Sequence, residues 1–197
     1  MTQNDNIVTH AAQANLPTRY GDFTLHIFRD GQGAEHMAVV AGAPQEGALV
    51  RLHSECATGD ILGSLRCDCR DQLESALRAI TAAGGGIVLY LRGHEGRGMG
   101  LANKIRAYAL QEQGMDTVSA NQHLGFVADG RDYAMAVAIL RHFGLSKVRL
   151  MTNNQQKLAA LADAGITVTE RVPLWTAENP HNEVYLATKR AKLGHLR

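Results

Sequence analysis

The sequence has no long hydrophobic run, no excess of charge of one sign and very few cysteines. No stretch approaches the roughly 18 apolar residues that indicate a membrane-spanning helix. The net charge is +1 over 197 residues, whereas a broad nucleic-acid surface needs a clear basic excess. Residues 1–6 have neither the basic nor the apolar segment of a secretory signal. We therefore expect a cytoplasmic protein with no nucleic-acid and no membrane partner, although local arginines could still hold a small phosphorylated ligand.

The few cysteines that are present lie in one short segment: Cys56, Cys67 and Cys69. An odd number of thiols cannot pair fully within one chain, and three cannot supply a four-thiolate structural zinc site. Three protein ligands and one open position are typical of a catalytic zinc. Free cysteines are often small buried hydrophobic residues, but Cys-Asp-Cys here stands between Arg66 and Arg70. Because a core strand would not carry charges on both sides, the pattern favours a metal site in a polar cleft.

Hydrophobic periodicity predicts one compact α/β domain, with an N-terminal antiparallel β layer followed by alternating helices and strands. Residues 1–16 are polar and aperiodic, and they predict a flexible arm ahead of a domain over residues 17–197. Alternation or short apolar runs predict strands over residues 19–29, 37–40, 48–52, 87–91, 147–152 and 166–172. Apolar residues at helical spacing predict helices over residues 73–80, 101–109, 133–140 and 154–164, with weaker helical character over 182–196. Residues 115–129 are predicted to be a long polar connection.

A glycine-rich loop, residues 93–100, follows the predicted strand 87–91 and precedes a predicted helix. Glycines let backbone N–H groups converge on an anion, and a helix N-terminus adds a partial positive charge. The loop matches neither the Walker pattern nor a dinucleotide fingerprint, and a flexible surface turn is the alternative. Arg97 could grip a phosphate as a fork, and Glu95 could accept from a base edge or hold a water.

Two further segments combine polar residues with a predicted strand or helix end. Thr152 to Lys157 runs from a buried strand into a helix, which is where open α/β sheets bind ligands. Its alternative is an N-cap at Asn153 or Asn154 with a solvated Lys157. Asp129 and Arg131 are two residues apart and could face one pocket from a turn, or form an exposed ion pair beside the next helix.

Several segments, in the same order along the chain, together resemble GTP cyclohydrolase II. They are Arg51-Leu-His-Ser-Glu-Cys-Ala-Thr-Gly-Asp60, Ser64-Leu-Arg-Cys-Asp-Cys69, His94-Glu-Gly-Arg-Gly-Met-Gly-Leu101, Lys104-Ile-Arg-Ala-Tyr108, Ala120-Asn-Gln-His-Leu-Gly-Phe126, Asp129-x-Arg-Asp-Tyr133 and Leu150-Met-Thr-Asn-Asn154. The similarity runs from about residue 15 to residue 196. The synthase domain fused ahead of some members is not expected in a chain of this length.

The resemblance implies an enzyme that opens the imidazole ring of GTP and releases formate and pyrophosphate. Its product would be 2,5-diamino-6-(5-phosphoribosylamino)pyrimidin-4(3H)-one, at the first step of riboflavin biosynthesis. It further implies one Zn2+ per subunit, Mg2+ on the triphosphate and a homodimer. The implied metal ligands are Cys56, Cys67 and Cys69. The implied GTP-binding residues are Arg51, Leu52, His53, Ser54, Glu55, Gln72, Glu95, Gly96, Arg97, Thr117, Thr152 and Lys157.

For catalysis, the resemblance implies Asp129 as proton acceptor and Arg131 as nucleophile. An arginine is protonated in proteins, so the alternative is that Arg131 stabilises charge on the α-phosphate. Zinc with three thiolates has a formal charge of −1, which would leave its water less acidic than three histidines would. A nearby base or donor is therefore expected, and Tyr108 and Glu95 are the candidates.

The chain departs from the family pattern at two places. The segment Arg92-Gly93-His94 is one residue longer than the shorter family form, and Arg70 stands where glycine is usual. Two other functions stay open at this point. One is a relative that stops at the formylated intermediate or uses another purine nucleotide. The other is a zinc-stabilised nucleic-acid module, which the small net charge and the missing fourth ligand disfavour.

Overall fold

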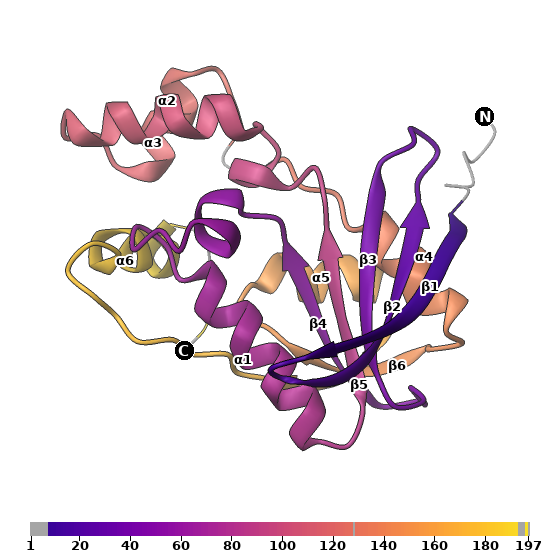
Figure 1. Cartoon of the computed structure of the whole chain (residues 1–197). Helices are drawn as coiled ribbons and strands as arrows, with labels where there is room; N and C mark the ends of the chain where they lie inside the picture. Colours follow the sequence, from indigo (N-terminus) through magenta and orange to yellow (C-terminus); the bar gives the residue numbers. More distant parts are fainter. Residues whose placement is uncertain (1–7, 128, 193–195, 197) are drawn as a thin grey trace.

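A mixed sheet of seven strands forms the centre of the computed structural model, which describes residues 8–127, 129–192 and 196 (Figure 1). The strands, in sheet order, are β1 (Thr9–Thr18), β2 (Gly21–Arg29), β3 (Glu35–Ala41), β5 (Gly86–Leu91), β4 (Ala48–Ser54), β6 (Lys147–Met151) and β7 (Thr167–Val172). The helices are η1 (Ala57–Ile61), α1 (Cys69–Ala82), η2 (Glu95–Arg97), α2 (Leu101–Glu112), α3 (Thr117–His123), α4 (Ala134–His142), α5 (Gln155–Asp163) and α6 (Glu183–Lys192). The predicted single compact α/β domain is confirmed.

The sheet is antiparallel in its N-terminal half and parallel in its C-terminal half. β1, β2, β3 and β5 pair antiparallel, whereas β5, β4, β6 and β7 pair parallel. The register of the parallel part sets Ser54 beside Leu91, so β4 and β5 end at the same level. Parallel strands need crossover helices, which cover both faces of the sheet.

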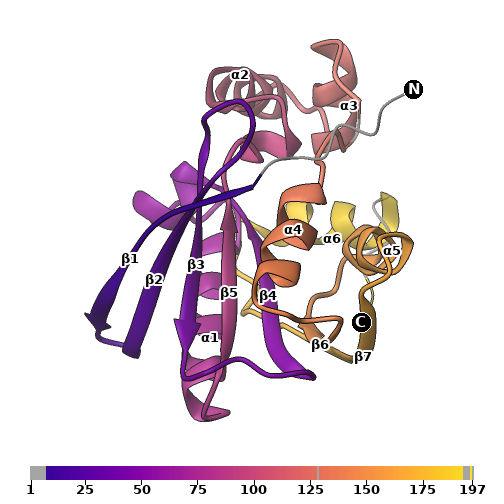
Figure 2. The same ribbon diagram turned by 90° about the vertical axis from the view of Figure 1, so that its right-hand side faces the viewer.

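The helices cover the two faces unequally. Figures 1 and 2 show α1 on one face and α4 and α5 on the other. Alternate residues of β4 serve the two cores, because side chains alternate along a strand. Leu49 packs toward Ala76 and Ile80 of α1, whereas Val50 and Leu52 belong to the larger core on the other face. This larger core also takes in the α4 residues Ala136, Ile139 and Leu140.

Three helices lie beyond the carboxyl ends of β4 and β5. In Figure 1, α2 and α3 form a pair above these strand ends, and α6 lies below the pair. A small core of their own, centred on Met99, Ala107 and Ala120, holds α2 and α3 together. The space between these helices and the strand ends is where the candidate site lies.

Two expectations from the sequence need correction. The predicted arm is wrong for residues 9–16, which belong to β1 and pair with β2, while residues 1–7 lie outside the described residues. The predicted polar connection over residues 115–129 contains α3, which begins where Asp116 caps the backbone N–H groups of Val118 and Ser119. No helix among the described residues has the length and apolar character needed to cross a membrane.

Candidate active site

A cavity lies beyond the carboxyl ends of β4, β5 and β6, closed by α2, α3 and α6. Residues that come shortly after β4, β5 and β6 line it, such as Glu55, Glu95 and Thr152. Loops at this edge of a parallel sheet commonly form ligand sites, because adjacent strands deliver their next residues to the same place. In this chain the order of strands at the edge therefore brings together segments that are about a hundred residues apart in the sequence, as in the bond from Arg51 Nη1 to the Met151 carbonyl.

The cavity brings together all but one of the residues predicted for the site. These are Arg51, His53, Ser54, Glu55, Cys56, Cys67, Cys69, Gln72, Glu95, Gly96, Arg97, Tyr108, Thr117, Asp129, Arg131, Thr152 and Lys157. Leu52 is the exception, since its side chain is fully buried in the core behind the cavity. Its backbone still takes part, because the Leu52 carbonyl accepts a hydrogen bond of 2.7 Å from Lys157 Nζ.

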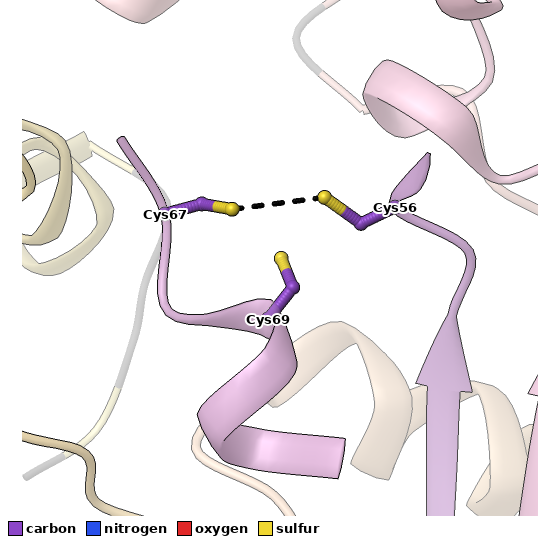
Figure 3. A group of neighbouring side chains, drawn as sticks. All are labelled: Cys56, Cys67 and Cys69. Carbon is purple, nitrogen blue, oxygen red and sulfur yellow. Dashed lines mark hydrogen bonds between the residues drawn. The ribbon is translucent and has the colours of Figure 1, made fainter. Parts of the chain in front are cut away.

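The three cysteines form a cluster on one wall of this cavity. Figure 3 shows their side chains pointing toward one another, with 3.7 Å between the sulfurs of Cys56 and Cys67. All three sulfurs lie within 4.8 Å of one another. Tetrahedral zinc with Zn–S bonds of about 2.3 Å sets its sulfurs about 3.8 Å apart. The spacing of the thiols therefore fits a zinc ion, and no His, Asp or Glu among the described residues joins the group as a fourth ligand.

Gly59 provides the room for this cluster. A Cβ at position 59 would lie 2.8 Å from Cys67 Sγ and 3.2 Å from Cys56 Sγ. The first distance is shorter than real Cβ atoms show and the second is tighter than most, so glycine is favoured here for its lack of a side chain rather than for its backbone freedom. Cys69 is the first residue of α1, where the helix dipole favours a negative charge.

The charges around the thiols are set by their mutual contacts and by Lys104. Hydrogen bonds from Cys67 and Cys69, and then the Lys104 ammonium, lower the pKa of Cys56 far below its ordinary value. The contact with Cys56 raises the pKa of Cys67 to about 11, and the contacts with Cys56 and Cys67 raise the pKa of Cys69 as well. Three thiolates so close together repel one another, which suits this donor set to a dication.

Lys104 and Glu95 form a buried ion pair beside the cysteines. Lys104 Nζ lies 2.6 Å from Glu95 Oε1, and Glu95 Oε2 accepts a 2.6 Å hydrogen bond from the Ala57 backbone N–H. Both oxygens of Glu95 thus have protein partners, and its side chain is only 7% exposed. Glu95 lines the cavity as predicted, and its carboxylate is fixed by Lys104 and by the start of η1.

Arg51 is held by a second buried network. Its guanidinium donates to the Met151 carbonyl and to Gln72 Oε1, at 3.1 and 2.6 Å. Gln72 in turn donates to Asp68 Oδ2 at 2.6 Å. Burial lowers the pKa of Arg51 to about 10, which still leaves it charged at neutral pH. The predicted residues Arg51 and Gln72 therefore belong to one hydrogen-bond network.

Asp129 and Arg131 form the predicted pair within the cavity. Arg131 Nε donates to Asp129 Oδ1 at 2.8 Å, and Nη2 contacts Asp129 Oδ2 in the bidentate arrangement. Burial opposes both charges, but the Asp129–Arg131 hydrogen bonds outweigh it. They lower the pKa of Asp129 and raise the pKa of Arg131. The alternative of an exposed ion pair is wrong, since the two side chains are 7% and 11% exposed.

His94, in the longer loop segment, connects to this pair through Ser54. Arg131 Nη1 donates to Ser54 Oγ at 3.2 Å, and Ser54 Oγ lies 3.1 Å from His94 Nδ1. Burial, followed by the charges of Arg131 and Lys157, lowers the pKa of His94 to about 4. The neutral ring can therefore accept a hydrogen bond from the Ser54 hydroxyl, while the Ser54 oxygen accepts a hydrogen bond from Arg131.

Other predicted residues face the cavity with unequal freedom. Arg97 has a positive φ of 64°, and its Nη1 is buried without a hydrogen-bond partner among the described residues. His53 Nε2 bonds Asp60, while its Nδ1 also has no partner there. The Thr152 hydroxyl is held by the backbone N–H of Asn154, and Asn154 caps α5 as predicted. Arg97 and His53 thus offer polar atoms for a ligand.

Tyr108, the predicted donor near the metal, lies on α2 and lines the cavity. The guanidinium of Arg66 stacks over its ring at 4.1 Å from the centroid. Burial raises the pKa of Tyr108, so its hydroxyl keeps its proton at neutral pH. Arg70, the second departure from the family pattern, forms a surface ion pair with Glu74 and does not line the cavity.

Among the residues around the site to which sequence reasoning assigned no role are Asp60, His94 and Lys104, whose side chains are buried. Asp60 accepts from the Cys56 N–H and from Tyr90, and it bonds His53. Lys104 falls on the same predicted helix as Tyr108, at the spacing that puts two side chains on one face. That spacing is the signal that could have found it.

Comparison with known proteins identifies the family of the chain. The sequence profile of the GTP cyclohydrolase II family matches residues 9–173. The protein named GTP cyclohydrolase-2 of Azotobacter vinelandii is 59% identical over 192 residues, which are 96% of this chain and 92% of that protein. The protein of the same name from Neisseria gonorrhoeae is 54% identical, over 96% of this chain and 97% of that one. A solved two-domain 3,4-dihydroxy-2-butanone 4-phosphate synthase from A. baumannii resembles the chain with a TM-score of 0.49 at 20% identity, over 88% of this chain and 42% of that one. From the extent of the profile match and the identity to these full-length relatives, the chain belongs to the GTP cyclohydrolase II family.

Proposed function

We propose that the protein hydrolyses GTP at the first step of riboflavin biosynthesis. The imidazole ring is opened, and formate and pyrophosphate are released. The product is 2,5-diamino-6-(5-phosphoribosylamino)pyrimidin-4(3H)-one. The observation that carries this proposal is one cavity with a three-thiol cluster on one wall and the cations of Arg97, Arg131 and Lys157 around it. A nucleotide triphosphate needs the cations, and hydrolysis of a purine ring needs an electrophilic centre near the base.

Cys56, Cys67 and Cys69 would hold one Zn2+ per subunit. The sulfur spacing, the room provided by Gly59 and the repulsion among three thiolates support this assignment. A zinc ion with three protein ligands would supply a Lewis acid beside the reacting carbon. Mg2+ would come with the triphosphate, since it binds phosphate oxygens and keeps several of its waters.

The side chains around the cavity would orient the nucleotide. Arg97 presents a buried guanidinium N–H without a protein partner, and a guanidinium matches the geometry of phosphate oxygens. His53 presents Nδ1 while Asp60 holds its other nitrogen, so it can accept from a donor on the base. Tyr108 would donate its hydroxyl proton, because burial keeps that proton in place at neutral pH.

Arg131 would stabilise charge on the α-phosphate while pyrophosphate leaves. The covalent alternative requires Arg131 to give a proton to Asp129 before its nitrogen attacks phosphorus. The pKa of Asp129 is lowered and that of Arg131 is raised, so this transfer runs uphill. Fixed cations aimed at developing charge are a common source of rate enhancement. We therefore assign Asp129 to hold and orient the guanidinium.

The remaining proposals concern partners and location. The family resemblance supports a homodimer, and the free thiols support the cytoplasm, where thiols stay reduced. Sedimentation of the purified protein would test the dimer, and fractionation of the producing cells would test the location.

The experiment for the main proposal measures formate, pyrophosphate and the mass of the product after incubation of GTP with zinc-loaded protein and Mg2+. We expect one formate and one pyrophosphate per GTP consumed. Consumption of GTP without formate would instead identify a relative that stops at the formylated intermediate. If GTP is untouched while another purine nucleotide is hydrolysed, or if metal-free protein is fully active, the proposal is wrong.

A further inference from the structure

Lys104 makes three hydrogen bonds that occupy all the donors of its ammonium group. Lys104 Nζ lies 3.1 Å from Cys56 Sγ, 2.8 Å from Thr58 Oγ1 and 2.6 Å from Glu95 Oε1. An ammonium group has three N–H bonds and no acceptor. The side chain is 11% exposed. Lys104 therefore has no N–H left for a substrate phosphate, although it lines the cavity.

The groups that Lys104 contacts all lie at or next to Cys56. Cys56 and Thr58 are contacted directly, and Glu95 reaches the intervening Ala57 N–H with its second oxygen. Burying an ammonium is costly unless it is paired and hydrogen-bonded. Glu95 satisfies the need for a counter-ion, so the contact with sulfur is an additional feature of the site. Its effect falls on the electron density of Cys56 Sγ.

We propose that Lys104 is a positioning residue of the metal site, which donates a charged hydrogen bond to one of the three thiolates and fixes Cys56 Sγ. This inference rests on the proposed zinc site. A dication with three thiolates has a net charge of −1, and the Lys104–Glu95 pair adds no net charge, so the ammonium acts on the cluster through its direct contact with Cys56 Sγ. A hydrogen bond from a cation also withdraws electron density from the sulfur. A metal held here therefore stays a stronger Lewis acid than three unassisted thiolates would allow.

The test replaces zinc by Co2+ and records the thiolate-to-cobalt charge-transfer band of the wild type and of Lys104→Met. Methionine keeps the length of the side chain and removes the charge. Without the ammonium, the sulfur electrons lie at higher energy, so we expect the band to move to longer wavelength. We also expect Co2+ affinity, measured by chelator competition, to fall about 10–100-fold, as is typical for a lost contact to a metal ligand. The kcat for GTP should fall while KM changes little.

Arg106→Met is the matched control, because Arg106 lies on the same helix, is exposed and bonds Asn103. Its band and affinity should equal those of the wild type. A merely structural role for Lys104 would lower the unfolding temperature without moving the band. A Lys104→Met band at the wild-type wavelength would therefore overturn the proposal.

A second pair of variants decides the matter if Lys104→Met takes up no cobalt. Lys104→Arg keeps the charge and should leave the band near the wild-type position, whereas Lys104→Gln should shift it to longer wavelength. Equal bands in these two variants would overturn the proposal. If the wild type itself shows no thiolate-to-cobalt band, the proposed metal site fails, which is a result distinct from failure of the Lys104 assignment.

Discussion

The antiparallel and parallel halves of the sheet contribute very differently to this protein. The parallel half, with β4 and β6, ends at the cavity and is followed by residues that line it. The antiparallel half, with β1 to β3, contributes no residue to the cavity lining, but its Phe28 is fully buried in the main core. The comparison teaches that the antiparallel half contributes to the core but not to the site, whereas the parallel half contributes to both. The predictions below test that difference, from the largest expected effect on turnover to the smallest.

Replacing Cys67 by Ser should have the largest effect. A hydroxyl is a poor ligand for zinc compared with a thiolate, so we expect bound zinc to be lost and formate release to fall to the level of a protein-free control. The free energy of unfolding measured without metal should change little, because the cluster lies at the cavity and outside the main core. Full formate release by zinc-free Cys67→Ser protein would contradict the metal assignment.

Arg131→Lys should lower kcat by about 10²–10³-fold, the usual cost of losing one well-placed group that stabilises developing charge. Lysine cannot reproduce the bidentate contact with Asp129. Rapid-quench kinetics with GTP would measure this loss. Isolation of a phosphorylated Arg131 peptide from the wild type would instead support the covalent alternative.

Gly59→Ala should weaken zinc binding about 10–100-fold and lower turnover at limiting zinc. The added Cβ would meet Cys67 Sγ at 2.8 Å, so at least one thiol must move. Chelator competition measures the affinity. The matched control is Gly31→Ala, where a Cβ would meet nothing within 4 Å; equal affinities in the two variants would contradict the steric role of Gly59.

His94→Leu should make stability less sensitive to acid. The pKa of His94 is lowered from 6.5 to about 4 by burial, so the unfolded chain takes up this proton first as the pH falls. The contribution of neutral His94 is fully present above pH 6.5 and is lost as the pH falls toward about 4. From this difference in pKa between the folded and unfolded states, the contribution to the free energy of unfolding is roughly 3 kcal/mol.

Urea unfolding at pH 7.5 and pH 4.5 measures this difference. The wild type should lose more stability than His94→Leu between the two values, and the exposed His181→Leu should behave as the wild type. An identical loss in all three proteins would show that His94 does not contribute. Turnover of His94→Leu should fall modestly, through the contact with Ser54.

Phe28→Ala should have the smallest effect on turnover and a large effect on stability. Phe28 is fully buried in the antiparallel half and packs against the rings of His142 and Phe143. Loss of a buried phenylalanine costs about 3–5 kcal/mol. We expect kcat per folded molecule to stay at the wild-type value. A fall in kcat without a loss of stability would contradict this difference between the two halves.

Local patterns in the sequence determined the elements of secondary structure and the chemistry of the site. The spacing of Cys56, Cys67 and Cys69, between charged residues, indicated a shared metal, and all three sulfurs do lie together. Apolar residues at every second position, or at helical spacing, located most strands and helices. This works because an element that is buried on one side carries apolar residues on that side. β1 and α3 escaped because β1 is largely exposed, and because α3 is a short helix that depends on the cap at Asp116.

Only the tertiary structure decided which polar groups are buried and with whom. A lysine on a helix is normally solvated, yet Lys104 is enclosed by Cys56, Thr58 and Glu95. Glu95, expected to be free for a ligand, is held by Lys104 and Ala57. These contacts join residues up to 48 positions apart. The sequence specifies which groups are available, but the order of strands in the sheet brings them within hydrogen-bonding distance.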